Sequence, residues 1–179
     1  ASITVPNWEQ DAPTPPSTTL YEYCSSGTVS ATMTSNNSKD EWYTSSSGGS
    51  PVYTGSSYTV SVGAGQTKNY WVLPKTAFGC AASGRTKVTV KSYQPSVGGS
   101  MGSNEGTVCH SASVSFTSSD KLGTITNWQY REKIGSGSWS SWSSFSTSSS
   151  TTQSKTITNS STQTMYAQVR VNVQNGVCS

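Results

Sequence analysis

The chain has few charged residues, few side chains that do chemistry and no long apolar run. Of its 179 residues only 11% are charged, and there is one histidine. An ordinary soluble domain is roughly 25% charged. Lys and Arg never cluster, so the net charge of +3 gives no electrostatic footprint for nucleic acid. No stretch approaches the ~20 apolar residues of a transmembrane helix. We therefore expect neither a nucleic-acid partner nor membrane insertion of this segment.

The scarce ionisable side chains form no catalytic or metal-binding pattern. His110 follows Cys109 directly, but no third ligand or base lies at a suitable spacing, and there is no C-x₂-C pair for zinc. A glycosidase needs two carboxylates across a cleft, and none of the eight lies in a loop framed by aromatic residues. Calcium at Asp40 or Asp120 is an alternative that no Asp-x-Asp pattern supports. We expect no enzyme, no catalytic or metal residue and no cofactor.

What the chain does have is hydroxyl and aromatic side chains. Ser and Thr make up about 35% of the residues, and there are six Trp and nine Tyr. Disordered chains are poor in aromatic residues. Hydroxyl side chains on the solvent face of strands are typical of extracellular all-β proteins. The composition therefore favours a folded, secreted β-protein.

Four cysteines and two tryptophans form a Cys…Trp…Cys frame that occurs twice. The first copy consists of Cys24, Trp42 and Cys80, and the second of Cys109, Trp128 and Cys178. Paired cysteines in a small polar chain indicate an oxidising compartment. The first residues nevertheless lack the basic start and apolar core of a signal peptide. We expect two oxidised β-domains in tandem, as an internal piece of a longer secreted protein.

Apolar residues alternate along short runs, with turn residues every 8 to 12 positions, which is typical of a β-sandwich. The expected strands of the first half cover 28–34, 41–44, 52–54, 58–62, 69–73 and 85–90. Those of the second half cover 112–116, 127–132, 139–145, 152–157 and 166–173. We expect Trp42 and Trp128 to lie in the two cores.

The pattern also divides the chain. The expected parts are 1–5 as the last strand of a preceding repeat, 6–16 as a proline-rich linker, 17–93 as domain 1 and 94–179 as domain 2. The boundary lies where Gln-Pro-Ser-Val-Gly-Gly interrupts the strands.

Domain 2 is expected to lack its last strand. Asn175-Gly176 is a strong hairpin signal, but the chain ends before a returning strand. In the first copy the returning strand reads Arg85-Thr-Lys-Val-Thr-Val, and a similar pattern opens the chain in Ala1, Ser2, Ile3, Thr4 and Val5. We expect segment 1–5 of a neighbouring molecule to fill the open edge by strand donation.

The two halves carry their motifs in the same order. The first half has Cys24-Ser-Ser-Gly, Glu41-Trp-Tyr and Asn69-Tyr-Trp-Val. The second half has Asn127-Trp-Gln-Tyr, Tyr166-Ala-Gln-Val-Arg and Gln174-Asn-Gly-Val-Cys-Ser. Over 13–179 the chain resembles the immunoglobulin-like (Ig-like) repeats of giant surface adhesins of Bacteroidetes, in particular the SprB-type gliding-motility adhesin. The resemblance implies two tandem Ig-like β-sandwich domains, each with one disulfide.

For function, the resemblance implies a repeat segment of a filamentous cell-surface adhesin that is exported by type IX secretion and moves during gliding. The segment is expected on the extracellular surface of a bacterium, attached to the outer membrane through a longer protein. Its expected partners are neighbouring repeats of the same chain and a surface polysaccharide or abiotic substratum. The family supplies no catalytic residues. The alternative is a carbohydrate-binding accessory module of a secreted polysaccharide-degrading enzyme.

The expected disulfides depart from those of antibody domains, which join the middles of two strands beneath the tryptophan. Cys24 precedes its strand by a Ser-Ser-Gly turn, and Cys80 follows Pro74 in a loop. We expect Cys24–Cys80 and Cys109–Cys178 bridges that join strand ends at one pole of each sandwich. Closing such loops stabilises a domain by about 4 kcal/mol in the chain-entropy model.

A cluster of aromatic residues is the one candidate binding surface. Its members are Tyr130, Trp139, Trp142 and Phe145, which cannot all fit beneath so thin a sandwich. Exposed flat rings stack on sugars or adhere to apolar substrata, and ordinary cross-strand pairing is the alternative.

The same cluster contains a short motif, Trp139-Ser-Ser-Trp142-Ser, that resembles the WSxWS signature of cytokine receptors. In those receptors arginines interleave with the tryptophans. Here only Arg131 and Lys133 are near in the sequence. We interpret the motif as a coincidence in a Ser-rich chain.

Overall fold

The computed structural model describes residues 12–179, which form strands and no helix. The chain divides into two compact units, Ala1–Gln94 and Pro95–Ser179, here called unit 1 and unit 2. Their border falls inside the segment where the strand pattern breaks off. The predicted all-β fold class is confirmed. Segment 1–5, with its predicted strand, and the part of the predicted linker up to residue 11 lie outside the described residues.

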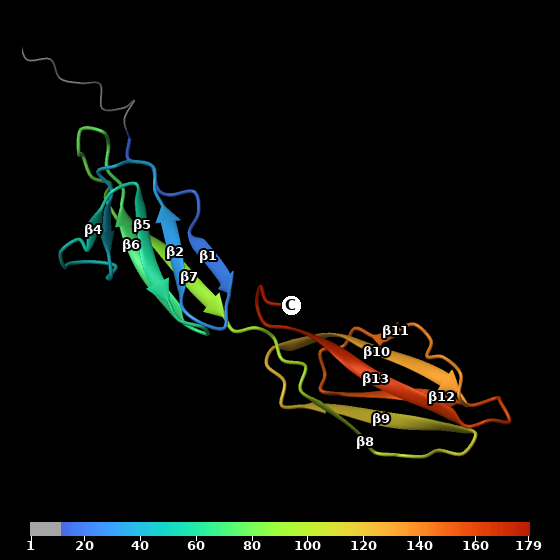
Figure 1. The fold of residues 1–179 in the computed structure, drawn as a ribbon. Helices are drawn as coiled ribbons and strands as arrows, with labels where there is room; N and C mark the ends of the chain where they lie inside the picture. The colour runs from blue at the N-terminus through green and yellow to red at the C-terminus, as the bar shows by residue number, and fades with distance from the viewer. Residues whose placement is uncertain (1–11) are drawn as a thin grey trace, which may run out of the picture. The chain divides into compact units, whose positions relative to one another are not determined.

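Unit 1 is a sandwich of two sheets (Figure 1). Its strands are β1 (Leu20–Cys24), β2 (Val29–Thr34), β3 (Glu41–Tyr43), β4 (Tyr53–Thr54), β5 (Ser57–Val62), β6 (Thr67–Leu73) and β7 (Thr86–Tyr93). The larger sheet has the order β1-β7-β6-β3-β4, and β2 pairs with β5. Strands β2 to β7 match the predicted segments to within a few residues, whereas β1 is not among the predictions.

The core of unit 1 lies between these sheets. Its buried members are Ala31, Met33, Trp42, Val60, Val62, Tyr70, Val72, Val88 and Val90. They come from alternate positions, because successive side chains of a strand point to opposite faces. Trp42 is fully buried, and its indole Nε1 donates a hydrogen bond of 3.0 Å to the Gly55 carbonyl oxygen. The predicted core position of Trp42 is thus confirmed.

Unit 2 also has two sheets, each of three strands. Its strands are β8 (Ser100–Ser103), β9 (Ser111–Ser119), β10 (Thr124–Ile134), β11 (Ser143–Ser146), β12 (Thr152–Thr158) and β13 (Met165–Gln174). The orders are β11-β10-β13 and β12-β9-β8 (Figure 1). The predicted strand over 139–145 begins only at Ser143, because the residues before it form a separate segment that carries two tryptophans.

The core of unit 2 is smaller. Its buried cluster consists of Ile125, Trp128 and Val173, so the predicted core position of Trp128 is also confirmed. Strand β12 even turns a lysine toward the sandwich interior: Lys155 Nζ lies 3.7 Å from the centre of the Tyr130 ring. Within the described chain the Trp128 indole nitrogen has no hydrogen-bond partner. Unit 2 is therefore the less completely packed sandwich.

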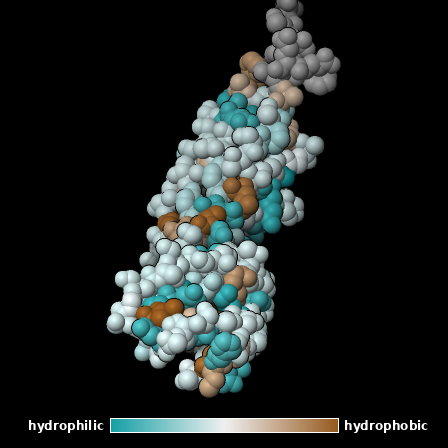
Figure 2. Space-filling model, turned by 90° about the vertical axis from the view of Figure 1, so that its right-hand side faces the viewer, coloured by the Kyte–Doolittle hydropathy of each residue, from teal (hydrophilic) through white to brown (hydrophobic). Residues whose placement is uncertain are grey.

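Hydroxyl side chains cover much of the outer strand faces. In Figure 2 the visible surface is mostly pale or hydrophilic, and its apolar patches are small and separate. Hydroxyls pair across strands, for example Thr32 with Thr59 at 2.8 Å and Ser115 with Ser154 at 2.8 Å. Residues 12–179 contain no helix with the length and apolar character needed to cross a membrane.

Candidate functional site

Two of the four residues of the predicted aromatic surface, Trp139 and Trp142, belong to a row of alternating aromatic and cationic side chains on the outer face of the β11-β10-β13 sheet. We call this row the cation–π ladder; its members are Tyr166, Lys133, Trp139, Arg131, Trp142 and Arg170. The cations come from β10 and β13, and the tryptophans from the segment between β10 and β11. Register brings these positions together, because Lys133 pairs with Tyr166, and Gln129 pairs with Arg170.

Each indole of the ladder has two cations over it. The Arg131 guanidinium lies 4.9 Å from the centre of the Trp139 ring and 4.6 Å from that of Trp142. Arg170 lies 4.3 Å from the Trp142 ring, and Lys133 lies 5.2 Å from the Trp139 ring. Such contacts contribute about 0.5–1 kcal/mol each at exposed sites. Both tryptophans are accordingly only partly exposed.

Hydrogen bonds hold the guanidinium groups in place. Arg131 Nε donates to Gln168 Oε1 at 2.9 Å, and Arg170 Nε donates to Gln129 Oε1 at 2.8 Å. The Ser140 backbone N–H donates to the Glu132 carbonyl at 2.8 Å and so fastens the tryptophan segment to β10. A planar guanidinium held at one edge keeps its faces free for stacking. The ladder is therefore a fixed structure.

The interpretation of the WSxWS-like motif as a coincidence is wrong in its structural premise. Arginines do interleave with Trp139 and Trp142. Arg170 was missed because it lies on β13, which adjoins β10 only through sheet pairing. The alternation of Gln and Arg along both strands was the available signal.

The other two residues of the predicted surface face the interior. Tyr130 and Phe145 meet edge to face with centres 6.2 Å apart, and Phe145 lies 6.3 Å from Trp128 in the core. The four aromatic residues are thus divided between the two faces of one sheet. They do not form one flat platform.

The cysteines differ most from the prediction. Cys80 and Cys109 are exposed free thiols, whereas Cys24 and Cys178 are disulfide-bonded. Neither the predicted Cys24–Cys80 bridge nor the predicted Cys109–Cys178 bridge is present.

The reason in unit 1 is that its two cysteines lie at opposite poles. Cys24 pairs with Tyr93 at the end of β7. Cys80 lies in the loop before β7, where Thr76 N–H donates to its carbonyl at 2.9 Å. Strand β7 has eight residues, which at ~3.3 Å per residue span more than 20 Å. A disulfide requires Cα atoms about 4.4–6.8 Å apart.

Unit 2 separates its cysteines in the same way. Cys109 precedes β9, and its carbonyl accepts a hydrogen bond of 2.6 Å from Ser111 N–H. Cys178 lies just beyond Gln174, which pairs with Thr124 after the other end of β9. The sequence placed each cysteine at a strand end, but it did not indicate which pole that end occupies.

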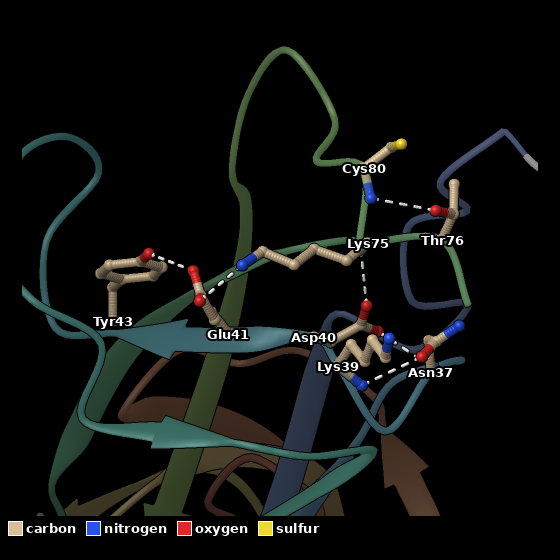
Figure 3. A network of polar contacts seen from close by, with 8 residues as sticks. All are labelled: Asn37, Lys39, Asp40, Glu41, Tyr43, Lys75, Thr76 and Cys80. Carbon is tan, nitrogen blue, oxygen red and sulfur yellow. Dashed lines mark hydrogen bonds and ion pairs between the residues drawn. The ribbon is translucent and has the colours of Figure 1, made fainter. Parts of the chain in front are cut away.

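A polar network at one pole of unit 1 uses the adjacent carboxylates Asp40 and Glu41 (Figure 3). Asp40 is almost fully buried; its Oδ1 accepts from Lys75 N–H at 2.7 Å and its Oδ2 from Asn37 N–H at 3.1 Å. Glu41 accepts from Lys75 Nζ at 2.5 Å and from the Tyr43 hydroxyl at 2.6 Å. Both carboxylates therefore hold loops together.

The charges of this network shift two pKa values. Hydrogen bonds from Lys75 and then Tyr43 lower the pKa of the Glu41 carboxyl below its ordinary 4.5. The bond to Glu41 raises the pKa of the Tyr43 hydroxyl. Arg85 lies over the Tyr43 ring at 3.2 Å and ties down the neighbouring turn by donating to the Ser45 and Gly48 carbonyls. Nowhere in residues 12–179 do three His, Cys, Asp or Glu side chains converge as metal ligands would.

The first and last strands of unit 1 form a parallel pair, β1 with β7, here called the terminal clamp. Five residue pairs run from Leu20–Thr89 to Cys24–Tyr93. The Thr89 N–H donates to the Thr19 carbonyl at 2.8 Å, and at the other end Ser25 N–H donates to the Tyr93 carbonyl at 2.9 Å. In Figure 1 the two arrows lie side by side and point the same way. Alternation of Tyr21 and Tyr23, which pack on the core, was the unused sequence signal for β1.

Comparison with known proteins agrees with this architecture. Residues 12–93, which include all strands of unit 1, match a family model described as "Ig-like domain CHU_C associated". The match supports an Ig-like domain of the Bacteroidetes type in unit 1. No curated protein matches the sequence.

Proposed function

We propose that this chain is a tension-bearing repeat segment of a filamentous bacterial surface adhesin, in which the sandwiches act as spacers. An Ig-like domain is compatible with a repeat or spacer role. The observation that carries the proposal is the terminal clamp of unit 1, because it decides how the domain responds to a pull on its ends.

A pull on the ends of unit 1 puts all hydrogen bonds of the terminal clamp under load at the same time. Strand β1 enters unit 1 beside Thr89 and ends beside Tyr93, where β7 also ends. A pull on the two chain ends therefore drags β1 and β7 in opposite directions along their length. The inter-strand bonds lie across this direction, so they resist in shear and share the force. Resistance to forced unfolding is governed by the unfolding rate, which such an arrangement lowers.

The finer assignment is supported by the resemblance of the sequence to giant Bacteroidetes adhesins. It comprises export by type IX secretion, exposure on the cell surface and a part in gliding motility. An Ig-like domain with a disulfide fits an extracellular location. The adhesive partner in this proposal is a surface polysaccharide or an abiotic substratum.

The alternative, a carbohydrate-binding module, needs a free aromatic face. Trp139 and Trp142 each have two cations over their rings. Tyr130 and Phe145 pack toward the interior. The ladder geometry therefore favours a stiffened spacer over a sugar-stacking platform.

Single-molecule stretching of the whole chain between its ends tests the load-bearing role. Thr89→Pro removes the N–H that bonds β1, and Ser92→Pro removes the N–H that donates to Gln66 at 2.9 Å on the opposite side of β7. Both changes remove one backbone bond of β7, but only the Thr89 bond crosses to the β1 side, whereas the Ser92 bond crosses to Gln66 beside β6. We expect Thr89→Pro to lower the unfolding force of unit 1 more than Ser92→Pro. Equal losses would exclude the clamp as the load-bearing element.

The surface location has its own test. Antibodies raised against the chain should label intact, unpermeabilised cells of the source bacterium along filaments. Labelling that requires permeabilisation would contradict the adhesin proposal and leave the mechanics of unit 1 untouched.

A further inference from the structure

The cation–π ladder gathers three positive charges on one outer sheet face of unit 2. Arg131 and Lys133 lie on β10, and Arg170 lies on β13 opposite Gln129. Side chains on one face of a strand are two positions apart, which is about 6–7 Å along the strand. Arg170, Arg131 and Lys133 therefore occupy three successive rungs of the β10–β13 pair. They form a row of cations along the sheet.

No carboxylate of unit 2 neutralises this row. Glu132 lies between Arg131 and Lys133 in the sequence, so its side chain leaves β10 on the opposite face. The other two carboxylates of unit 2, Glu105 and Asp120, lie on either side of β9 in the chain, and β9 belongs to the other sheet. Among residues 12–179 the ladder cations form no salt bridge. The row is therefore a patch of uncompensated positive charge.

The cations of the row repel one another, and the aromatic rings hold them in place. Arg131 and Arg170 both lie over the Trp142 ring, at 4.6 Å and 4.3 Å from its centre. Coulomb repulsion between charges this close is weakened by water but not removed. An anion beside the row offsets this repulsion and is attracted by the summed field of the three cations. The surface thus favours a negatively charged partner.

The two ladder arginines keep donors for such a partner. Within residues 12–179 the hydrogen bonds of Arg131 and Arg170 use Nε, which donates to Gln168 and Gln129 respectively. Arg85 of unit 1 differs, because its Nη1 donates to two carbonyls of the neighbouring turn. The Nη groups of each ladder arginine are thus left for an acceptor from outside. Two parallel N–H groups of a guanidinium match the two oxygens of a carboxylate.

The surroundings of the row favour a sugar polymer over a nucleic acid. Single-stranded nucleic acids stack their bases on bare aromatic rings, but Trp139 and Trp142 each have two cations over their rings. Uncharged polar side chains adjoin the row, and such groups form hydrogen bonds with sugar hydroxyls. They are Gln129, Ser140, Ser141 and Gln168.

We propose that the outer face of the β11-β10-β13 sheet binds an anionic polysaccharide, whose carboxylates pair with Arg131, Lys133 and Arg170. A polymer of uronic acids carries a carboxylate on each sugar, so it presents a regular row of anions to the row of cations. The arginine forks bind carboxylates through two N–H groups, and Lys133 adds a point charge. The guanidinium edges bind the polymer while their faces stay on the indoles. Binding therefore leaves the ladder intact.

This inference rests on the adhesin proposal for the place of the chain outside the cell, and it names the chemistry of the adhesive partner. Its test uses purified protein. A failure to bind the polymer would leave the stretching and labelling results of the adhesin proposal untouched. If the chain proves not to be an adhesin, a measured affinity for the polymer remains a separate result.

Titration calorimetry with matched ligands provides the first test. The whole chain should bind an oligomer of galacturonic acid, and its affinity should fall as the salt concentration rises. The methyl ester of the same oligomer has the same sugar backbone without the charges and should not bind. Binding of both oligomers alike, or of neither, would overturn the proposal. So would equal or tighter binding of a polyglutamate peptide or a single-stranded oligonucleotide of the same charge, because the sugar would then add nothing.

Matched variants of the chain provide the second test. Lys133→Gln with Arg170→Gln should weaken binding of the galacturonate oligomer by about tenfold or more. Lys39→Gln with Lys87→Gln removes two exposed lysines from unit 1 and should change the affinity by about twofold or less. Arg170→Lys keeps the charge without the fork and should give an intermediate affinity. Equal losses in the two double variants would overturn the proposal.

Nuclear magnetic resonance locates the contact in the unchanged chain and does not depend on the folding of any variant. The indole N–H signals of Trp139 and Trp142 should shift as the galacturonate oligomer is added, because both rings lie beside the bound carboxylates. The signal of Trp42, which is buried in unit 1, should stay in place. Shifts confined to unit 1 would overturn the proposal.

Discussion

Units 1 and 2 pair their strands alike from β2 to β6 and from β9 to β13. They differ in the pairing of the first strand, β1 or β8, and in the strand β7, which follows β6 in unit 1. In unit 1, β7 supplies Val88 and Val90, and the buried cluster has nine members. In unit 2 no described strand comes after β13, and the buried cluster has three members. One strand therefore accounts for much of the difference in packing. The last strand of this fold is part of the core.

The presence of β7 also determines which sheet the first strand of a unit joins. In unit 1, β1 joins the larger sheet beside β7, in parallel. In unit 2, β8 pairs antiparallel with β9 in the opposite sheet. Ser100 of β8 pairs with Ser119, at the end of unit 2 where Thr124 pairs with Gln174. Within the described residues, β8 begins and β13 ends at the same pole of unit 2, whereas β1 begins and β7 ends at opposite poles of unit 1. Among the strands of residues 12–179, a parallel pair that resists in shear is found in unit 1.

Truncation of the two core tryptophans should give the largest difference between the units. Trp42→Ala should destabilise unit 1 by about 3–5 kcal/mol through the cavity and the lost bond to Gly55. Trp128→Ala should cost unit 2 less, because its indole has no bond partner among the described residues and its buried cluster has three members. Urea unfolding followed by residue-resolved NMR separates the units. Equal losses would contradict the comparison.

Removal of the central ladder cation comes next. Arg131→Ala should destabilise unit 2 by about 1–2 kcal/mol, because it removes two indole contacts and the bond to Gln168. The near-ultraviolet circular dichroism signal should decrease, because the Trp139 and Trp142 rings lose their fixed orientation. Lys91→Ala in unit 1 is the control, since Lys91 lies over a single ring, at 4.4 Å from Tyr93. Equal losses of stability in the Arg131→Ala and Lys91→Ala chains would contradict a stabilising role of the ladder.

Acid should weaken unit 1 through Glu41. Its folded pKa is lowered by Lys75 and Tyr43, so its contribution is present above the ordinary value of 4.5 and is lost as pH falls below that value. The expected loss is about 1 kcal/mol or less, because the pair is partly solvated. Glu41→Gln should remove this part of the pH dependence when unfolding is measured from about pH 6 to about pH 3. If the free energy of unfolding of Glu41→Gln kept the same dependence on pH, other carboxyls would be responsible for the acid destabilisation.

The smallest effect concerns the free thiols. Cys80→Ser and Cys109→Ser should each change stability by less than about 0.5 kcal/mol, because both side chains are exposed and unbridged. Alkylation without reductant, read by peptide mass spectrometry, should modify Cys80 and Cys109 only. Cys24 and Cys178 should react after reduction. Modification of none of the four before reduction would restore the pairing expected from the sequence.

Local patterns predicted much of the fold and little of the candidate site. Alternation located Trp42, Trp128, Val88 and Val90 on inner faces, since a period of two is readable within one strand. Alternation could not predict that Arg170 belongs to the ladder, because Arg170 is brought there by the pairing of strands that are distant in sequence. The alternation of Tyr21 and Tyr23 indicates β1 locally, but its pairing with β7, about seventy residues further along the chain, is not readable within one strand.

By itself, the sequence determined that the protein is all-β, that it has two sandwiches and that each surrounds one tryptophan. Composition and alternation suffice for this, because burial of every second side chain is a local property of a strand. Only the tertiary structure decided that the cysteines of each unit lie at opposite poles, that the ladder covers the indole faces and that β1 pairs in parallel with β7. Those features depend on which strands become neighbours and in which direction they run, and these choices are settled by packing across the whole unit.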